Sequence, residues 1–266
     1  MGRLQSIFEA CRARGERVLV PYITAGDPDL ATTAQLLPAL AAGGADIIEV
    51  GIPFSDPLMD GPTIQRASHR ALLAGTTPHS VMATVAEARS QLSCGVIYMV
   101  PYNLVWRYGL DAFAADCAKS GVDGVLITDL PPEEADDWQS AADAHGVETI
   151  YLLAPTSSPE RIRLAAAKAT GFIYLISRRG VTGVQSSVPI ELAGLVAGIR
   201  AETSVPIAVG FGIATPEQVA QVCAVADGAV VGSALVDKLA AAADSQARIA
   251  IAESMIRELK SGTKNV

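Results

Sequence analysis

Apolar, strand-like segments recur along this chain at regular intervals, separated by segments rich in Ala and Leu. Several are β-branched and nearly all apolar, which is typical of parallel strands covered on their outer face. The expected strands are residues 18–24, 46–51, 95–100, 122–128, 148–153, 172–177, 206–210 and 228–231. About eight such units, each followed by a helical segment, favour a closed (β/α)8 barrel of the α/β class over an open doubly wound sheet.

Helix starts mark the segments between these strands. A cap residue, a proline in the first turn and an early acid together indicate a helix N-terminus. Such combinations, or part of them, occur at residues 27–28, 131–134, 157–160 and 215–217. A further amphipathic helix, with Leu4, Ile7, Phe8 and Cys11 on one stripe, precedes the first strand. Because this helix begins directly at the N-terminus, we expect no secretory signal peptide there.

Length and composition point to one domain. The chain has 266 residues, 50% of them hydrophobic, and barrels of roughly 250 residues fold around a single core. No linker or shift in composition divides the sequence, so we expect one barrel domain over residues 1–266. No apolar run is long enough to span a bilayer, so we expect no membrane association.

Several functional classes are disfavoured. A net charge of −8 argues against a nucleic-acid partner, because such binding needs clustered Lys and Arg. The four cysteines lack C-x-x-C spacing and predict small buried side chains in a reducing cytoplasm. None of the three histidines falls at a strand end beside a carboxylate, so we expect neither a metal site nor a histidine base.

Two carboxylates bracket the loop after the second expected strand. Glu49 lies within the apolar run 47–50, and Asp60 ends a Gly/Pro/Ser/Asp-rich loop. A buried carboxyl has a raised pKa and can donate a proton near neutral pH. The alternative, which holds for most glutamates, is that Glu49 faces water and Asp60 caps the helix after Gly61. The pair therefore indicates proton-transfer chemistry if both acids face one cavity.

Glycine turns follow the last two expected strands. The sequences are Gly210-Phe211-Gly212-Ile213 and Val231-Gly232-Ser233-Ala234. Glycine lets backbone N–H groups approach an anion, and Ser233 stands at a helix start, where the helix dipole favours negative charge. Barrels often bind phosphate at these two loops. The alternative is that the turns only let strands meet helices.

Other residues at the expected top of the barrel complete a candidate pocket. Tyr22, Tyr102, Leu126 and Tyr174 are plausible walls for a flat aromatic ligand, although as large apolar side chains they also suit the core. The long, polar, glycine-punctuated loop 177–187 is a candidate lid.

These motifs together resemble the tryptophan synthase alpha subunit. The match covers nearly every position of 48–61 and extends to 22–28, 101–103 and 129–131. In the loop 177–187, Arg178, Thr182 and Gly183 stand on the family's lid positions. Met59 and Arg179 depart from the family, where small residues are usual.

The resemblance implies a TIM-barrel lyase that cleaves indole-3-glycerol phosphate to indole and glyceraldehyde 3-phosphate. Glu49 would be the acid and base, and Asp60 would bind the indole N–H. Gly212, Gly232 and Ser233, beside Phe211, would hold the phosphate. The family's pyridoxal phosphate belongs to the beta subunit, so no cofactor is expected on this chain.

The resemblance also implies a partner. The beta subunit would join this chain in an alpha2-beta2 heterotetramer, with indole passed between them. Pro53, Phe54 and Asp56 place an apolar ring and an acid beside the expected site, which suits a partner contact. The alternative is that Phe54 only plugs the barrel rim.

Two other functions stay open from the residues. One is another phosphate-binding barrel enzyme, although an indole-glycerol-phosphate synthase would need a strand-end Lys and a ribulose-phosphate epimerase would need metal-binding His. The other is a regulatory subunit that binds a phosphometabolite without catalysis, against which the intact pair Glu49 and Asp60 argues.

Overall fold

The computed structural model describes residues 2–176, 190–210 and 212–264. Its parallel strands close into a barrel in sequence order, and β8 pairs with β1. The strands are β1 (Val18–Thr24), β2 (Ile47–Gly51), β3 (Gly95–Val100), β4 (Gly124–Ile127), β5 (Glu148–Leu153), β6 (Ile173–Ile176), β7 (Ile207–Gly210) and β8 (Gly228–Val231). The predicted (β/α)8 class is confirmed, and all eight expected strands are present.

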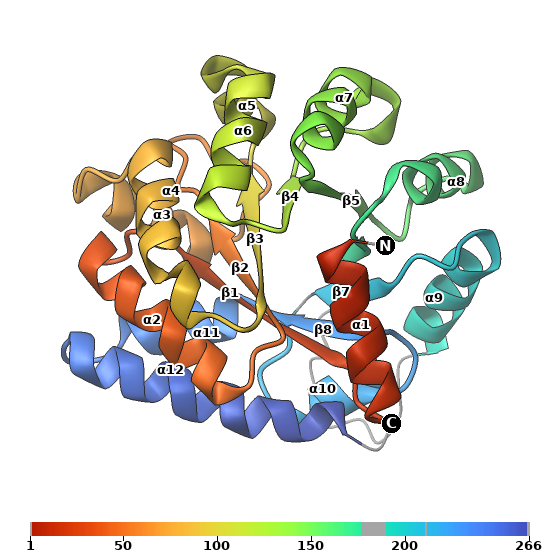
Figure 1. Cartoon of the computed structure of the whole chain (residues 1–266). Coiled ribbons are helices and arrows are strands. Elements are labelled where there is room, and N and C mark those ends of the chain that lie inside the picture. The colour runs from red at the N-terminus through yellow and green to blue at the C-terminus, as the bar shows by residue number, and fades with distance from the viewer. Residues whose placement is uncertain (1, 177–189, 211, 265–266) are drawn as a thin grey trace.

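Helices surround the barrel, except that α1 covers its base (Figure 1). They are α1 (Arg3–Ala13), α2 (Leu30–Gly43), α3 (Pro62–Leu73), α4 (Pro78–Ala88), α5 (Tyr102–Tyr108), α6 (Leu110–Ser120), α7 (Asp136–His145), α8 (Pro159–Lys168), α9 (Ile190–Glu202), α10 (Pro216–Cys223), α11 (Ser233–Ala240) and α12 (Ser245–Lys260). Single 3-10 turns cover Arg89–Gln91, Pro132–Glu134 and Ser261–Thr263. The main hydrophobic core lies between the sheet and these helices, and α12 packs along α2 (Figure 1).

Two of the four predicted helix starts are confirmed without change. Ser158 caps α8, and Thr215 forms a reciprocal capping box with Gln218 at the start of α10. The start expected at 27–28 is displaced, because α2 begins at Leu30 and Asp29 accepts the Thr32 N–H at 2.6 Å. The segment 131–134 forms a 3-10 turn, and α7 begins only at Asp136.

The predicted N-terminal helix closes the base of the barrel. Leu4, Phe8 and Cys11 of α1 are buried against the inward-facing side chains of the strands. A Cβ atom at Gly124 would lie 2.8 Å from Leu4, so the glycine at this strand start makes room for the plug. Glu148 caps α1 from a distance, because its Oε1 accepts the Leu4 N–H at 2.8 Å.

Three aspartates link neighbouring strands at the base of the barrel, where the strands begin. Asp46, Asp123 and Asp227 directly precede β2, β4 and β8. Each carboxylate accepts the backbone N–H of one residue on the preceding strand at 2.8 Å, and each aspartate N–H donates to that residue's carbonyl; the partners are Leu19, Val96 and Ile207. These paired bonds hold the strand starts in register, independently of the chemistry at the other end.

The four cysteines are buried and free, as predicted. Across the described residues, no helix is long and apolar enough to cross a membrane.

Candidate active site

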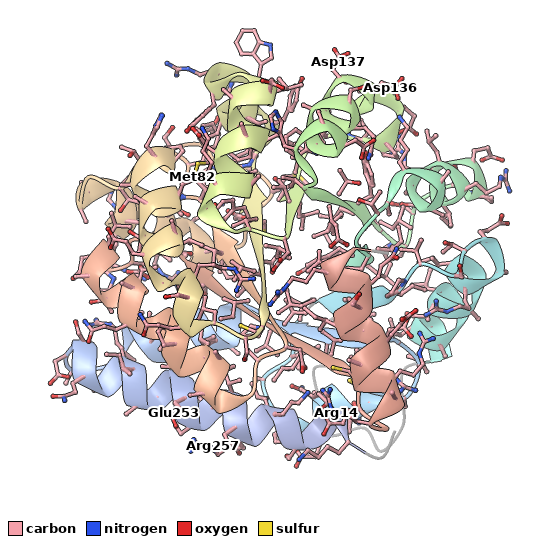
Figure 2. All side chains as sticks on the ribbon, viewed as in Figure 1. Arg14, Met82, Asp136, Asp137, Glu253 and Arg257 are labelled. Carbon is pink, nitrogen blue, oxygen red and sulfur yellow. The ribbon has the colours of Figure 1, made fainter. Side chains whose placement is uncertain are left out.

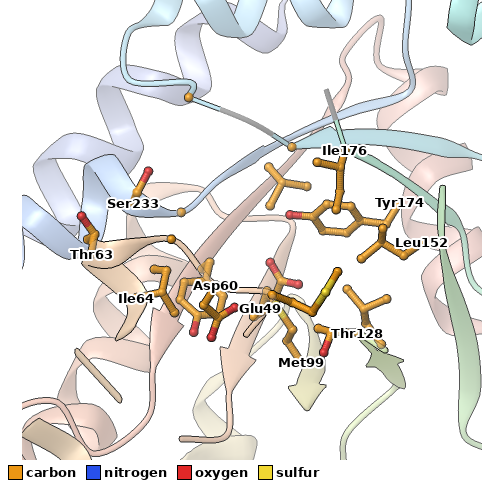
Figure 3. Close-up of a pocket in the computed structure, with 18 of the residues that line it drawn as sticks. Glu49, Asp60, Thr63, Ile64, Met99, Thr128, Leu152, Tyr174, Ile176 and Ser233 are labelled. Atoms are coloured by element: carbon orange, nitrogen blue, oxygen red, sulfur yellow. The ribbon is translucent and has the colours of Figure 1, made fainter. Parts of the chain in front are cut away.

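A cavity of about 410 Å³ opens at the carboxyl end of the barrel strands. Figure 3 shows side chains from β2, β3 and β6 converging on it from different sides. The lining residues are Tyr22, Glu49, Met59, Asp60, Gly61, Pro62, Thr63, Ile64, Met99, Leu126, Thr128, Leu152, Tyr174, Ile176, Gly210, Gly212, Val230, Gly232 and Ser233. This is the end of the barrel at which enzymes of this fold carry out their chemistry.

Glu49 faces the interior of the barrel because side chains alternate along β2. Ile47 belongs to the interior cluster, whereas Ile48 and Val50 pack under the outer helices. Glu49 is 1% exposed and lines the cavity, which excludes the alternative that it faces water. Its Oε1 has no hydrogen-bond partner among the described residues, so this atom is available to a ligand.

The environment of Glu49 favours its protonated form. Burial, and then the nearby charge of Asp60, raise the pKa of Glu49 to about 8. Burial also raises the pKa of Asp60, to about 6. Between these values Glu49 is a neutral acid and Asp60 is a carboxylate. Two acids whose environments separate their pKa values in this way can take different roles in one reaction.

Asp60 reaches the cavity from the loop before α3. The N-cap of α3 is Gly61, with Pro62 in the first turn, and no side chain caps this end. The alternative role of Asp60 as a helix cap is therefore wrong. The loop leaves its carboxylate half-buried at the cavity wall, beside Glu49 in Figure 3.

The glycine turns after β7 and β8 meet at one side of the cavity. Gly212, Gly232 and Ser233 all line it. Gly212 has φ +63°, a conformation that favours glycine. Ser233 is the first residue of α11, and no side chain caps that helix. Its first N–H groups lack partners within the helix and are suited to an anion.

Most of the predicted wall residues meet in the cavity. Tyr22, Leu126 and Tyr174 line it, whereas Tyr102 does not. Tyr102 begins α5, where its N–H donates to Asp129, and its side chain packs against the outer core. Burial, and then the charge of Glu49, raise the pKa of Tyr174 well above its usual value, so it stays a neutral phenol.

Four predicted site residues lie outside the described part of the chain. They are Arg178, Thr182 and Gly183 of the candidate lid, and Phe211 of the first glycine turn.

The cavity also contains residues that the sequence analysis did not single out. They are Pro62, Thr63, Ile64, Met99, Thr128, Leu152, Ile176 and Val230. Strand register was the available signal for several of them. Met99 pairs with Leu126, and Leu152 pairs with Tyr174, so each shares a level with a predicted wall residue.

A second cavity of about 240 Å³ adjoins the first one. Phe54 and Asp56 of the predicted partner surface line it, while Pro53 is buried. Met59 and Asp60 line both cavities. At the tip of the same loop, Leu58 is 83% exposed and Met59 is 62% exposed. The loop therefore presents apolar side chains to solvent directly beside the candidate catalytic acids.

No cluster of potential ligands that could hold a metal ion occurs within the described ranges 2–176, 190–210 and 212–264.

The fold and the cavity together define a (β/α)8 barrel with two acids and two glycine turns at the carboxyl end of its strands. The tryptophan synthase alpha chain family model matches residues 8–264. The chain belongs to this family, and it is a lyase of tryptophan biosynthesis that cleaves indole-3-glycerol phosphate.

Individual relatives cover nearly the whole chain. The tryptophan synthase alpha chain of Geobacter sulfurreducens is 51% identical over 236 residues, which are 89% of each chain. That of Gloeobacter violaceus is 47% identical over 100% of this chain and 96% of its own.

Solved structures agree. One of Mycobacterium tuberculosis tryptophan synthase has a TM-score of 0.90 at 38% identity, and covers 99% of this chain and 98% of its own. The alpha subunit of Legionella pneumophila str. Paris has a TM-score of 0.91 at 36% identity and full coverage of both chains.

Proposed function

We propose that this chain cleaves indole-3-glycerol phosphate with Glu49 as the acid and base and Asp60 as the group that stabilises charge on the indole. The observation that carries this assignment is the state of Glu49. Its carboxyl is fully buried, faces the cavity with an unpartnered oxygen, and has a pKa of about 8. At neutral pH it therefore holds a proton inside the pocket, where the substrate can take it.

The proposed reaction needs one proton to be delivered and one to be removed. Glu49 donates its proton to C3 of the indole ring, which gives an indolenine-like cation. The ionised Asp60 accepts the indole N–H and stabilises this positive charge. The Glu49 carboxylate then takes the proton of the glycerol hydroxyl next to C3. The electrons of that O–H bond form the aldehyde, and those of the C–C bond return to the ring, which releases indole and glyceraldehyde 3-phosphate.

Binding of the phosphate would fix the reacting carbon at Glu49. Gly212, Gly232 and Ser233 lie at the positions where the backbone can approach an anion. The apolar walls Leu126 and Tyr174 suit the indole ring. The cavity of about 410 Å³ falls within the range of small-molecule sites, which is about 300–1,000 Å³.

The wider setting follows from family membership. The chain works with a beta-subunit partner, since solved relatives are structures of tryptophan synthase. We infer an alpha2-beta2 assembly in the cytoplasm, with residues 1–266 acting as one barrel domain and with Phe54 and Asp56 at the contact. The proposed steps use only groups of this chain, and pyridoxal phosphate is expected on the beta subunit alone.

The test is release of indole from indole-3-glycerol phosphate, with and without a beta subunit. The wild-type chain should produce indole, and Glu49→Gln should lower turnover by roughly 10²–10⁴-fold while the fold is retained. Glutamine matches the shape of glutamate but cannot cycle a proton. Near-normal turnover by this variant, with its circular dichroism unchanged, would refute the assignment.

A further inference from the structure

A polar contact joins α3 and α11, the two helices whose first turns border the active-site cavity. Thr63, in the first turn of α3, donates its hydroxyl hydrogen to the carboxylate of Asp237 on α11, at 3.0 and 2.9 Å from the two oxygens. Arg66 approaches the same carboxylate at 3.4 Å and the Thr63 hydroxyl at 3.2 Å. Thr63 itself lines the cavity.

Each partner in this contact is close in sequence to a proposed site residue: Thr63 to Asp60, and Asp237 to Ser233. Thr63 follows Asp60 by three residues, so a shift of the first turn of α3 moves the backbone that carries Asp60. Asp237 lies one turn after Ser233, at the exposed side of the helix that begins at the candidate phosphate site. Figure 3 shows Thr63 and Ser233 on the same side of the cavity, away from Leu152.

The two helices also share an apolar contact beneath this polar one. Ala67 of α3 and Val236 of α11 are buried with Tyr22, and Ile64 packs against the same cluster. This contact holds the middle of α3 against α11. The end of α3 next to Asp60 lacks a side-chain cap, and the bond from Thr63 to Asp237 restrains that first turn.

We propose that Asp237 is a positioning residue for the cleavage reaction, because its carboxylate holds Thr63, and with it Asp60, in fixed relation to the phosphate-binding end of α11. The inference rests on the proposed function of Asp60 and of the glycine turns. It assigns no contact between Asp237 and the substrate.

Because Asp237 is negatively charged, its positioning role can be distinguished from a purely electrostatic effect on phosphate binding. An acid one turn from an anion site disfavours the anion, and Arg66 only partly offsets it because both side chains are more than half exposed. If Asp237 acted only through its charge, its removal would strengthen phosphate binding and leave turnover unchanged. A positioning role predicts a loss of turnover instead.

The experiment compares four variants of the full chain with the wild type. Asp237→Ala should lower kcat for indole-3-glycerol phosphate by about three- to tenfold, with calorimetric affinity for glyceraldehyde 3-phosphate unchanged or tighter. Asp237→Asn keeps an acceptor for the Thr63 hydroxyl and should stay within about twofold of wild type. Thr63→Val should lower kcat, and Thr63→Val with Asp237→Ala should lower it no further.

A matched control removes a surface carboxylate elsewhere. Glu253 pairs with Arg257 one turn along α12, on its outer face (Figure 2), and Glu253→Ala should leave kcat unchanged. Unaltered kcat in Asp237→Ala, additive losses in the double variant, or an equal loss in Glu253→Ala would each overturn the proposal. These outcomes need an active wild type, whereas no cleavage by the wild type would overturn the proposed function together with this inference.

Discussion

At the scale of single residues, the two acids differ in how completely each is removed from water. Glu49 is 1% exposed, whereas Asp60 is only half-buried on a loop. The charge of Asp60 adds to the effect of burial on Glu49, but burial is the larger cause. Their roles therefore follow from position: the fully buried acid keeps its proton, and the partly solvated one loses it first.

This difference predicts a bell-shaped pH dependence of kcat/KM. Activity needs neutral Glu49, so it should fall as pH rises through about 8. It also needs ionised Asp60, so it should fall as pH drops through about 6. The measurement is the rate of indole release across this range.

Asp60→Asn is the control for that profile. The substrate phosphate also titrates at about pH 6, and it should do so in both proteins. In the variant, only the part of the acid-side fall in kcat/KM that is due to Asp60 should disappear. The alkaline limb should also move to lower pH, because the charge that raises the pKa of Glu49 is gone. An alkaline limb at the wild-type position would contradict the coupling.

The sequence identifies Glu49 because a charge within an apolar strand is visible without a structure, and Asp60 because it ends the loop that follows that strand. It does not identify Met99 or Leu152, which look like any core residue until strand register places them at the level of Leu126 and Tyr174. Tyr102 shows the opposite error, since the residue after a strand end need not point into the barrel. Side-chain direction at a strand–loop junction is set by local backbone geometry, which composition does not encode.

At the scale of elements, the repeated βα pattern is strong enough to give every strand, while several ends move by one or two residues. The start of α2 was misplaced for a long-range reason. Asp27 looks like a cap, but both of its oxygens accept bonds from Arg70 of α3 at 2.7 Å, and Asp29 caps the helix. A partner 43 residues away cannot be read from the local sequence.

The turn after β7 gives a test of the phosphate site. Gly212→Asp should abolish measurable binding of glyceraldehyde 3-phosphate in calorimetry, because the side chain obstructs the backbone and repels the anion. Gly212→Ala is the matched control, since at φ +63° it carries the same backbone strain without the charge. Wild-type affinity in Gly212→Asp would place the phosphate elsewhere.

The aspartates that link neighbouring strands at the base of the barrel give a prediction about stability. Asp123 accepts the Val96 N–H at 2.8 Å and pairs with Arg89 and Arg3 at 3.3 Å each. Asp123→Ala should lower the free energy of unfolding by about 1–3 kcal/mol, measured by urea denaturation, because it leaves a strand N–H without its partner. Glu253→Ala, which removes a partly exposed carboxylate of α12 that accepts no strand N–H, should change the free energy of unfolding by no more than about 0.5 kcal/mol. Equal free energies of unfolding for the two variants would show that the Asp123 contacts do not stabilise the fold.

At the scale of the whole molecule, structure and chemistry occupy opposite ends of the barrel. The base is closed by α1 and carries the partly buried aspartates that link the strands, while the top carries both cavities and the most exposed apolar residues of the loop before α3. A partner that covers this loop would contact residues adjacent to Asp60. Such a contact could change catalysis without entering the cavity.

This arrangement predicts which side chains transmit activation by the beta subunit. Adding the beta subunit should raise cleavage above that of the isolated chain. Leu58→Ser and Phe54→Ala should weaken this activation more than they weaken basal cleavage. Leu73→Ser is the matched control, because Leu73 is 76% exposed on α3 and Leu58 is 83% exposed on the loop. Equal activation of all three variants would show that the loop is not part of the interface with the beta subunit.

In the proposed reaction Glu49 passes a proton directly to the indole ring. That transfer can be followed without net cleavage, as exchange of the C3 proton of indole with D2O in the presence of glyceraldehyde 3-phosphate, measured by NMR. The wild-type chain should accelerate the exchange well above the rate in buffer, and Glu49→Gln should return it to the buffer rate while still binding the phosphate ligand. Exchange at the wild-type rate in Glu49→Gln would contradict the central claim.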